Sequence, residues 1–422
     1  EEIQDEEVTS IVTLEYSGSG DRTHSWTIPL QITSMTEYLM IPEKQFTERW
    51  EFSTSVIRTF SGERRACLRL TPRVWLKYDF KFDSHEEMAY IYGYMLRSQD
   101  HWGRVFNTIL ASRISSVTGL STESNVVYGS NLLPGDYRTG KSAAIITPSG
   151  VTRDVTVQSV GIGNLTLQKK SPITARNAYI APYVNVQGVK GFQMKVGSGV
   201  GDHAISADVF VLENPYVDPS MSGYITHNGL YVMHKPIVDE YTIDSYKLAE
   251  EIDNGTAKPF WINNTRRARH RRTVKFMATT IQEVDQLKKF FINMKGKYTP
   301  FWLPSYENFK PASGLTHFGN GALAIEGDVT KRIGGGNLGV RYKKNNCNER
   351  YIFCGQVANV QFENDHLGKR TMISFSSDPF GNKTVPASSI ELITPMHKVR
   401  LDTDTIEFEY DGRDKMTVST IP

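Results

Sequence analysis

Apolar and polar residues alternate along much of this chain, which is the pattern of β-strands that bury one face. In the run VWLKYDFKF, the rings of Tyr78, Phe80 and Phe82 fall on the same face. Residues 1–62 contain further alternating runs, such as IVTLEYSG at 11–18. The pattern therefore predicts a chain rich in β-structure from its first segment onward.

Two segments instead carry apolar residues at helical spacing, and each follows an alternating strand. In the first, Ser84 and Glu87 have the spacing of a capping box, which satisfies free N–H groups of a first helical turn. Its apolar stripe comprises Met88, Ile91, Tyr94 and Met95. In the second, Thr280 and Glu283 form the box, and Gly296 stands where a left-handed residue would end the helix. Its stripe comprises Ile281, Val284, Leu287, Phe290, Phe291 and Met294.

The two strand–helix segments are related by a constant shift along the chain. Residues 73–107 align with residues 269–303 without a gap, at an offset of 196, the difference between 269 and 73. The aromatic segment that follows the first helix, which we call the aromatic exit, contains Phe106, and this residue aligns with Trp302. A period this long does not fit a solenoid, so the alignment predicts two related modules fused in one chain.

Each module precedes a run of short strands separated by Gly and Pro turns, in 143–187 and in 340–393. Four or five short strands at this spacing predict a small barrel of the SH3 or OB type. Residues 188–225 and 396–420 supply further strands. The expected fold class is therefore α+β and β-rich: two duplicated strand–helix modules, each with a small β-barrel insertion or appendage.

These elements divide the chain into four expected domains. They are an N-terminal β region plus the first α+β module (1–118), the first small barrel with its closing strands (119–225), a linker plus the second module (226–315), and the second small barrel with its closing strands (316–422). Within the linker part, 226–262, a short helix is expected near Ser245–Ile252.

Composition narrows the class of protein. The chain has 422 residues, 39% of them hydrophobic and 22% charged, which is ordinary for a globular protein. A formal net charge of +2 gives no electrostatic case for nucleic acid or an anionic membrane. No run approaches a membrane span. The opening EEIQDEE lacks the charged and apolar regions of a secretory leader, and a leader trimmed before Glu1 stays an open alternative. Three cysteines without CxxC spacing favour reduced thiols in a cytoplasm.

The sequence GDYRTGKS, from Gly135 to Ser142, matches the phosphate-loop pattern GxxxxGK[ST]. That loop functions between a buried strand and a helix, whose N-terminal N–H groups hold phosphate. Here SNLLP precedes the pattern, and Pro148 follows too soon for a helix. A β-turn with an exposed Lys141 is the favoured interpretation, and nucleotide binding through Lys141 is the alternative.

The densest charge is the run Arg266–Arg272. Phosphate contact with nucleic acid is one interpretation, but no stacking aromatic residues are interleaved. A solvated or subunit-bridging face is favoured, so nucleic acid is not an expected partner. The candidate subunit interface comprises Arg267, Arg269, Arg271, Phe301 and Trp302.

The remaining candidate chemistry has simpler interpretations. Asp402 and Asp404 precede Glu407 and Glu409, but strand alternation with Ile406, Phe408 and Tyr410 facing inward explains the glutamates. The histidines lack the spacing that places two metal ligands on one helical face, and no nucleophile motif occurs. No catalytic residue, metal site or cofactor is therefore expected, and the protein is not expected to be an enzyme.

Three further segments have distinctive sequences: FxTxVxRTxSGxRRAxLRxxPR from Phe52 to Arg73, GKYTPFWLPSY at 296–306, and VRLDTDTIEFEY at 399–410. Together they resemble the tail proteins of tailed bacteriophages. The first module departs from the pattern, since it keeps only Val105 and Phe106 of the aromatic exit. The resemblance implies a structural protein of the virion tail, assembled in the host bacterial cytoplasm.

In such a tail, the resemblance implies a homo-oligomeric ring around the tail tube or at its tip, in contact with other tail proteins such as the tail tube and tail-tip proteins. An Arg-rich face and the edges of small sheets suit subunit contacts. An alternative is a carbohydrate- or receptor-binding tail module, in which some of the six Trp rings would stack on sugars. Buried Trp side chains would favour the ring.

Overall fold

The computed structural model describes residues 8–17, 23–32, 36–38 and most of 45–420. Within 45–420 the undescribed positions are 60–61, 83, 98–101, 108–109, 116–120, 130–136, 148–151, 162, 175–176, 197–202, 213–219, 222, 236, 247–248, 254, 256–257, 259, 264–268, 306, 313–315, 318–321, 334–335, 344–349, 366–367, 378–384 and 412–415.

The described chain is mostly β, which corrects the α+β expectation. The strand–helix segments do not form separate modules, because both contribute their strands to one 15-stranded sheet. The appended sheets are not closed into barrels, so the SH3- or OB-like expectation is also wrong. The strand pattern was recognised correctly, but closure depends on pairing between the first and last strands, which no local pattern specifies.

We call residues 45–211 the first half and residues 237–420 the second half. The first half contains β4 (Gln45–Glu51), β5 (Thr54–Thr59), β6 (Gly62–Cys67), β7 (Arg73–Phe82), α1 (His85–Arg97), β8 (Trp102–Phe106), β9 (Ser112–Arg113), β10 (Val126–Tyr128), β11 (Ser142–Ile146), β12 (Thr152–Gly161), β13 (Asn164–Leu167), β14 (Tyr179–Lys195) and β15 (His203–Val211).

The second half contains β18 (Ile237–Tyr246), β19 (Ala249–Ile252), β20 (Phe260–Asn263), β21 (Arg269–Ala278), α2 (Ile281–Met294), β22 (Phe301–Pro304), β23 (Thr316–His317), β24 (Ala322–Glu326), α3 (Thr330–Ile333), β25 (Asn337–Lys343), β26 (Arg350–Asp365), β27 (Gly368–Phe375), β28 (Val385–Pro386), a 3-10 turn (Ala387–Ser389), β29 (Ile390–Val399), β30 (Thr405–Asp411) and β31 (Met416–Thr420). Outside the halves lie β1 (Val8–Ser17), β2 (Thr23–Ile32), β3 (Thr36–Tyr38), β16 (Thr226–His227) and β17 (Leu230–Tyr231).

The two halves pair their strands in the same order. In the first half the order is β10-β13-β12-β11-β14-β15-β7-β4, and β8 also pairs with β14. In the second half, β24-β27-β26-β25-β29 is followed by β30-β31-β21-β18, and β22 pairs with β29. β21 begins and ends 196 residues after β7 begins and ends, which is the offset of the sequence alignment. The internal repeat therefore extends beyond the aligned segment to the whole strand order.

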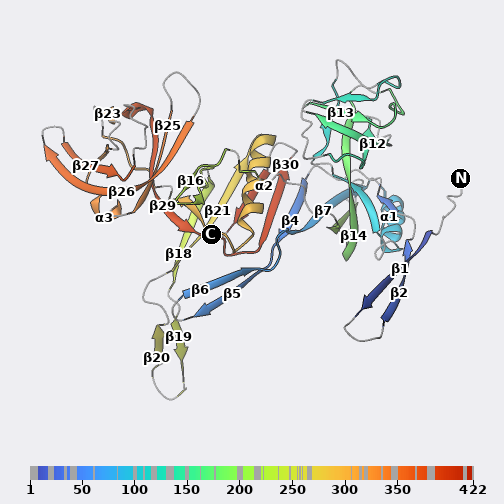
Figure 1. Cartoon of the computed structure of the whole chain (residues 1–422), viewed down its shortest axis with the longest axis horizontal. Helices are drawn as coiled ribbons and strands as arrows, with labels where there is room; N and C mark the ends of the chain where they lie inside the picture. The colour runs from blue at the N-terminus through green and yellow to red at the C-terminus, as the bar shows by residue number, and fades with distance from the viewer. Residues whose placement is uncertain are drawn as a thin grey trace.

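The halves differ where β14 corresponds to two strands. β14 runs without interruption from the appended sheet into the central sheet. In the second half a turn at 400–404 separates β29 from β30, so the appended strands form their own six-stranded sheet. Figure 1 shows the two appended sheets on opposite sides of the central strands.

The central stretch contains eight strands in the order β14-β15-β7-β4-β30-β31-β21-β18. All neighbouring pairs in it are antiparallel. One hydrophobic core includes residues of both halves and of α1 and α2. The appended sheets bury cores of their own, one around Ile145 and Leu165 and the other around Val340 and Ile393.

The second predicted helix is confirmed in detail. All six residues of the predicted stripe on α2 are buried. Thr280 is the N-cap, and its Oγ1 accepts a hydrogen bond from the N–H of Glu283 at 3.2 Å. Lys295 and Gly296 both take the left-handed conformation at the end, with φ of 53° and 63°. In α1, Met88 is buried as predicted, whereas the side chains of Ile91, Tyr94 and Met95 lie outside the described residues.

The linker expectation needs correction. Residues 226–262 contain strands instead of a plain connection, and the helix expected near Ser245–Ile252 is absent from the described chain, where β18 ends and β19 begins. The segment SYKLAEEI has residues with good helix propensity, but pairing with β21 and β20 outweighs that weak preference.

Candidate assembly interface

The two halves are joined by pairing between β4 and β30, which we call the internal seam. Seven consecutive residue pairs form it, from Thr405 opposite Glu51 to Asp411 opposite Gln45. The ladder is antiparallel and has no bulge. A pleated sheet thus passes from the first half into the second without a break.

A buried ionic network lies on the helix side of the internal seam. The carboxylate of Glu48, only 6% exposed, accepts hydrogen bonds from Trp50 Nε1 at 2.6 Å, Lys288 Nζ at 2.6 Å and Tyr410 Oη at 2.9 Å. Glu48 and Trp50 come from β4, Tyr410 from β30 and Lys288 from α2. A buried carboxylate with three donors is satisfied, so the network fixes the position of both halves relative to α2.

The ring of Phe408 fills the centre of the same region. It is fully buried and lies edge-on to Trp50 at 4.9 Å and to Phe291 at 6.0 Å between ring centroids. The ammonium group of Lys288 lies 5.9 Å from the centroid of the Phe408 ring. Apolar and ionic contacts of the internal seam are therefore interleaved.

Asp404 ties the turn before β30 to both halves. Its Oδ2 accepts from the N–H of Thr54, and its Oδ1 accepts from Thr54 Oγ1 and from the N–H of Lys297, all at 2.9 Å. The Asp404 carbonyl accepts from the N–H of Phe52 at 2.8 Å. A Cβ at Gly296 would collide with Asp404, so glycine is required both by this approach and by its positive φ. Sequence patterning did not reveal this role of Asp404.

The β5–β6 hairpin reaches from the first half across the internal seam. Arg65 donates from Nη1 to the carbonyl of Lys297, and its Nη2 contacts Glu63 at 2.9 Å. The second half has a hairpin at the matching place in its strand order, β19–β20, between β18 and β21. Figure 1 shows both hairpins extending from the same side of the central strands.

The central stretch has two edges that match the strands of the internal seam. β18 pairs with β21 on one side, and no described strand pairs with its other side. Residues 188 and 192–195 of β14 pair with β15 across a register shift, and no described strand pairs with residues 188–195 on the opposite side. By the common strand order, β18 corresponds to β4 and this part of β14 corresponds to β30.

Residue equivalences follow from the ladders. Phe408 pairs with Val418, which pairs with Phe276. Met194 pairs with Ile205, which pairs with Phe80, 196 residues before Phe276. Met194 therefore occupies in the first half the position of Phe408 in the second. Phe408 is fully buried by the internal seam, whereas Met194 is 41% exposed at the edge.

The residues predicted as a subunit interface fall in several environments. Arg269 and Arg271 lie on β21, and Arg271 pairs with Asp402 at 2.5 Å. Arg267 and the side chain of Arg269 lie outside the described residues. Phe301 and Trp302 are buried within the chain: Phe301 lies 5.1 Å from Phe290, and Trp302 Nε1 donates to the carbonyl of His227 at 2.9 Å. These two rings therefore serve the chain's own core.

The other candidate motifs also have clear positions. Lys141 precedes β11, and the described residues after it form a strand where a phosphate loop would need a helix. Along β30 the glutamates are exposed and the alternate residues Ile406, Phe408 and Tyr410 are buried, as predicted. No cluster of three or more His, Cys, Asp or Glu suited to a metal occurs among the residues described. The Trp side chains described, those of Trp50, Trp75 and Trp302, are buried.

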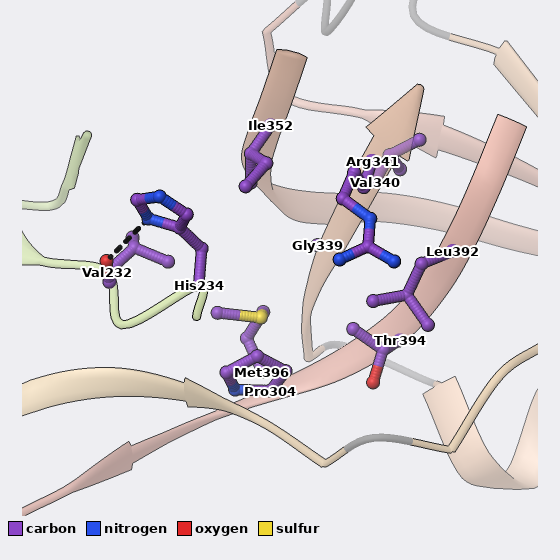
Figure 2. Close-up of a pocket in the computed structure, with 10 residues that line it drawn as sticks. All are labelled: Val232, His234, Pro304, Gly339, Val340, Arg341, Ile352, Leu392, Thr394 and Met396. Carbon is purple, nitrogen blue, oxygen red and sulfur yellow. Dashed lines mark hydrogen bonds between the residues drawn. The ribbon is translucent and has the colours of Figure 1, made fainter. Parts of the chain in front are cut away.

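A cavity of about 170 Å³ lies where the segment after β17 meets β25 and β29. Figure 2 shows His234 and Arg341 at its walls, among apolar side chains such as Leu392 and Met396. Burial lowers the pKa of His234, so its ring is neutral near pH 7. The described lining contains no carboxylate or thiol that would complete an acid–base or nucleophilic site.

In the described part of the chain, no helix has the length and apolar character needed to cross a membrane. Comparison with known protein families and with curated proteins finds no match to this chain.

Proposed function

We propose that this protein is a structural, non-enzymatic component of a bacteriophage tail, which assembles from several copies into a ring around the tail tube or at its tip. The observation that carries the proposal is the internal seam. One junction of the β4–β30 type is closed inside the chain, and the strands that correspond to its two sides, β18 and β14, form the edges of the same sheet.

The strand directions suit head-to-tail addition. Because eight strands alternate in direction from β14 to β18, the β18 edge of one copy runs antiparallel to the β14 edge of the next. Each added copy would continue the sheet with the same alternation. A head-to-tail contact of this kind closes into a ring when its rotation permits, and open sheet edges are otherwise a liability that proteins tend to cover.

The tail assignment rests on the three segments that resemble phage tail proteins. One residue from each segment takes part in the Asp404 contacts: Thr54 from the first, Lys297 from the second and Asp404 from the third. The segments are far apart in sequence but meet at the internal seam. The part of the chain that carries the resemblance is therefore the part that joins one repeat to the next, which supports a role in assembly.

Assembly in solution and in particles tests this function. Purified protein, alone and mixed with tail tube protein, should form rings visible by negative-stain electron microscopy, with a mass by light scattering that is a multiple of one chain. Antibody against this chain should label the tail of purified particles. A protein that stays monomeric under both conditions and is absent from particles would remove the proposal.

A further inference from the structure

The internal seam and the two open edges differ in chemistry at matching positions. Glu48 pairs with Leu76, and the corresponding Arg272 pairs with Ile243, so Ile243 on β18 holds the ladder position of Glu48. The residue 196 positions before Lys288 is Tyr92 on α1. The two members of the buried ion pair thus correspond to an isoleucine on the edge strand β18 and a tyrosine on α1, and neither of these residues is charged.

Apolar residues lie at the matching positions along β14. Met194 stands at the position of Phe408, and Val196, immediately beyond the strand, continues the ladder to the position of Tyr410. Met194 is 41% and Val196 is 55% exposed, although both are apolar. Tyr92 is half-buried and packs against the main core. Exposed apolar residues at a sheet edge indicate a surface that another chain covers.

We infer that the junction between copies is a version of the internal seam, formed by β18 of one copy and residues 188–196 of the next, in which the face that carries Met194 and Val196 is apolar. In it, Ile243 of one copy takes the place of Glu48 beside Tyr92, Met194 and Val196 of its neighbour. The inference rests on the proposed ring and adds the partner, a second copy of this chain, and the chemistry of the contact.

The difference between the two junctions has a physical reason. The internal seam forms once, during folding, and its ion pair is never separated by a solvent-filled gap in the native chain. A junction between copies must form from two exposed edges. Charged edges would lose their hydration on docking, whereas apolar side chains gain from leaving water.

Two single substitutions separate this junction from any other mode of assembly. Met194→Lys places a charge at the apolar side of the junction and should weaken association by at least about tenfold, the effect expected of an unpaired charge at a buried contact. The matched control is Phe362→Lys on β26, which adds the same charge at an apolar residue of similar exposure (38%) in an appended sheet, away from both edges of the central stretch. It should assemble like the unchanged protein. Thermal unfolding of both monomers should stay close to that of the unchanged chain, because both positions are exposed there.

A paired exchange tests the chemistry directly. Ile243→Glu alone should block association, and adding Tyr92→Lys to it should restore association by recreating the ion pair of the internal seam between copies. The restored assembly should weaken as salt rises from low to molar concentration, since added salt screens ion pairs. Assembly of the unchanged protein should stay constant or strengthen over that range.

The outcomes distinguish this inference from the proposed function. If the unchanged protein forms rings but Met194→Lys and Ile243→Glu form them equally well, the apolar junction is overturned while the ring stands. If neither the unchanged protein nor the paired exchange associates and particles lack the chain, the proposed function fails. Loss of association in Phe362→Lys equal to that in Met194→Lys would also contradict the inference.

Discussion

Phe408 and Met194 occupy the same position of a repeated strand order, yet one is buried and the other exposed. The difference lies in what covers them. β4 of the first half covers Phe408 with Trp50, whereas no described strand lies beside the part of β14 that carries Met194. One junction between repeats is thus completed within the chain, and the equivalent strand β18 and residues 188–195 of β14 have no described partner on their outer sides.

The two positions should respond very differently to truncation. Phe408→Ala removes a ring packed between Trp50 and Phe291 and should destabilise the chain by about 3–5 kcal/mol. Met194→Ala removes a side chain already in contact with water and should change the stability of the monomer by less than about 0.5 kcal/mol. Guanidinium unfolding measures both changes. Equal losses of stability would contradict the contrast between Phe408, which β4 covers, and Met194, which no described strand covers.

Removing one partner of the buried ion pair sharpens the same comparison. Lys288→Met leaves the Glu48 carboxylate without its cationic partner and should cost about 3 kcal/mol or more. The matched change in the first half, Tyr92→Met, should cost less than about 1.5 kcal/mol because it removes no charge and Tyr92 is only half-buried. Unfolding curves of the two variants provide the test, and a larger loss at Tyr92 would contradict the role assigned to the ionic network.

The Asp404 contacts give the next largest effect. Asp404→Ala leaves the N–H groups of Thr54 and Lys297 without their acceptor, and we expect a loss of about 2 kcal/mol. Asp402→Ala is a suitable control, since its pairing with Arg271 is partly exposed and should contribute less than about 1 kcal/mol. Thermal and denaturant unfolding measure the loss of stability in both variants. Equal losses in Asp404→Ala and Asp402→Ala would contradict the role assigned to Asp404.

The smallest expected effect is a pH dependence at α2. Partial burial alone raises the pKa of Glu283, but hydrogen bonds from Thr279, the nearby charge of Lys235 and the N–H of Thr280 together lower the pKa below its ordinary value. A lowered folded-state pKa adds stability above the unfolded pKa of about 4.3, and that stability is lost as pH falls through the folded pKa.

Glu283→Gln should therefore reduce stability above about pH 5 by up to about 0.5 kcal/mol and flatten the acid limb of the stability profile. The exposure of this side chain keeps the effect small. Stability measured between about pH 3 and pH 7 checks the slope. An acid limb with the same slope in the variant would show that Glu283 is not responsible for it.

Local features of this molecule were predictable from the sequence to the extent that they depend on neighbouring residues. The alternation of Tyr78, Phe80 and Phe82 predicts β7, and Thr280 with Glu283 predicts the start of α2, because both signals lie within one element. The helix expected near Ser245–Ile252 failed because pairing with distant strands decided the outcome.

The internal seam was not predictable in the same way. Glu48 stands between Phe46 and Trp50 in the alternating pattern of β4, and a carboxylate at such a position needs partners if it is buried. Its cation, Lys288, lies 240 residues further along the chain, and Asp404 binds Thr54 across 350 residues. The repeat predicts two related halves, but the pairing of β4 with β30 follows only from the strand order of the folded chain.

The most direct test of the account is a disulfide across the proposed junction. Glu407 faces Arg49 in the internal seam, and the same ladder relations assign Gln193 and Asp244 to the matching places on β14 and β18. Facing residues of antiparallel strands have Cα separations within the range that a disulfide spans. A chain carrying Gln193→Cys and Asp244→Cys should, on mild oxidation, give a ladder of covalent multimers that ends at the ring. Each single variant, like the unchanged protein, should give none at these positions. Rings that form without any cross-link between these two positions would contradict the claim that β18 and β14 close the junction.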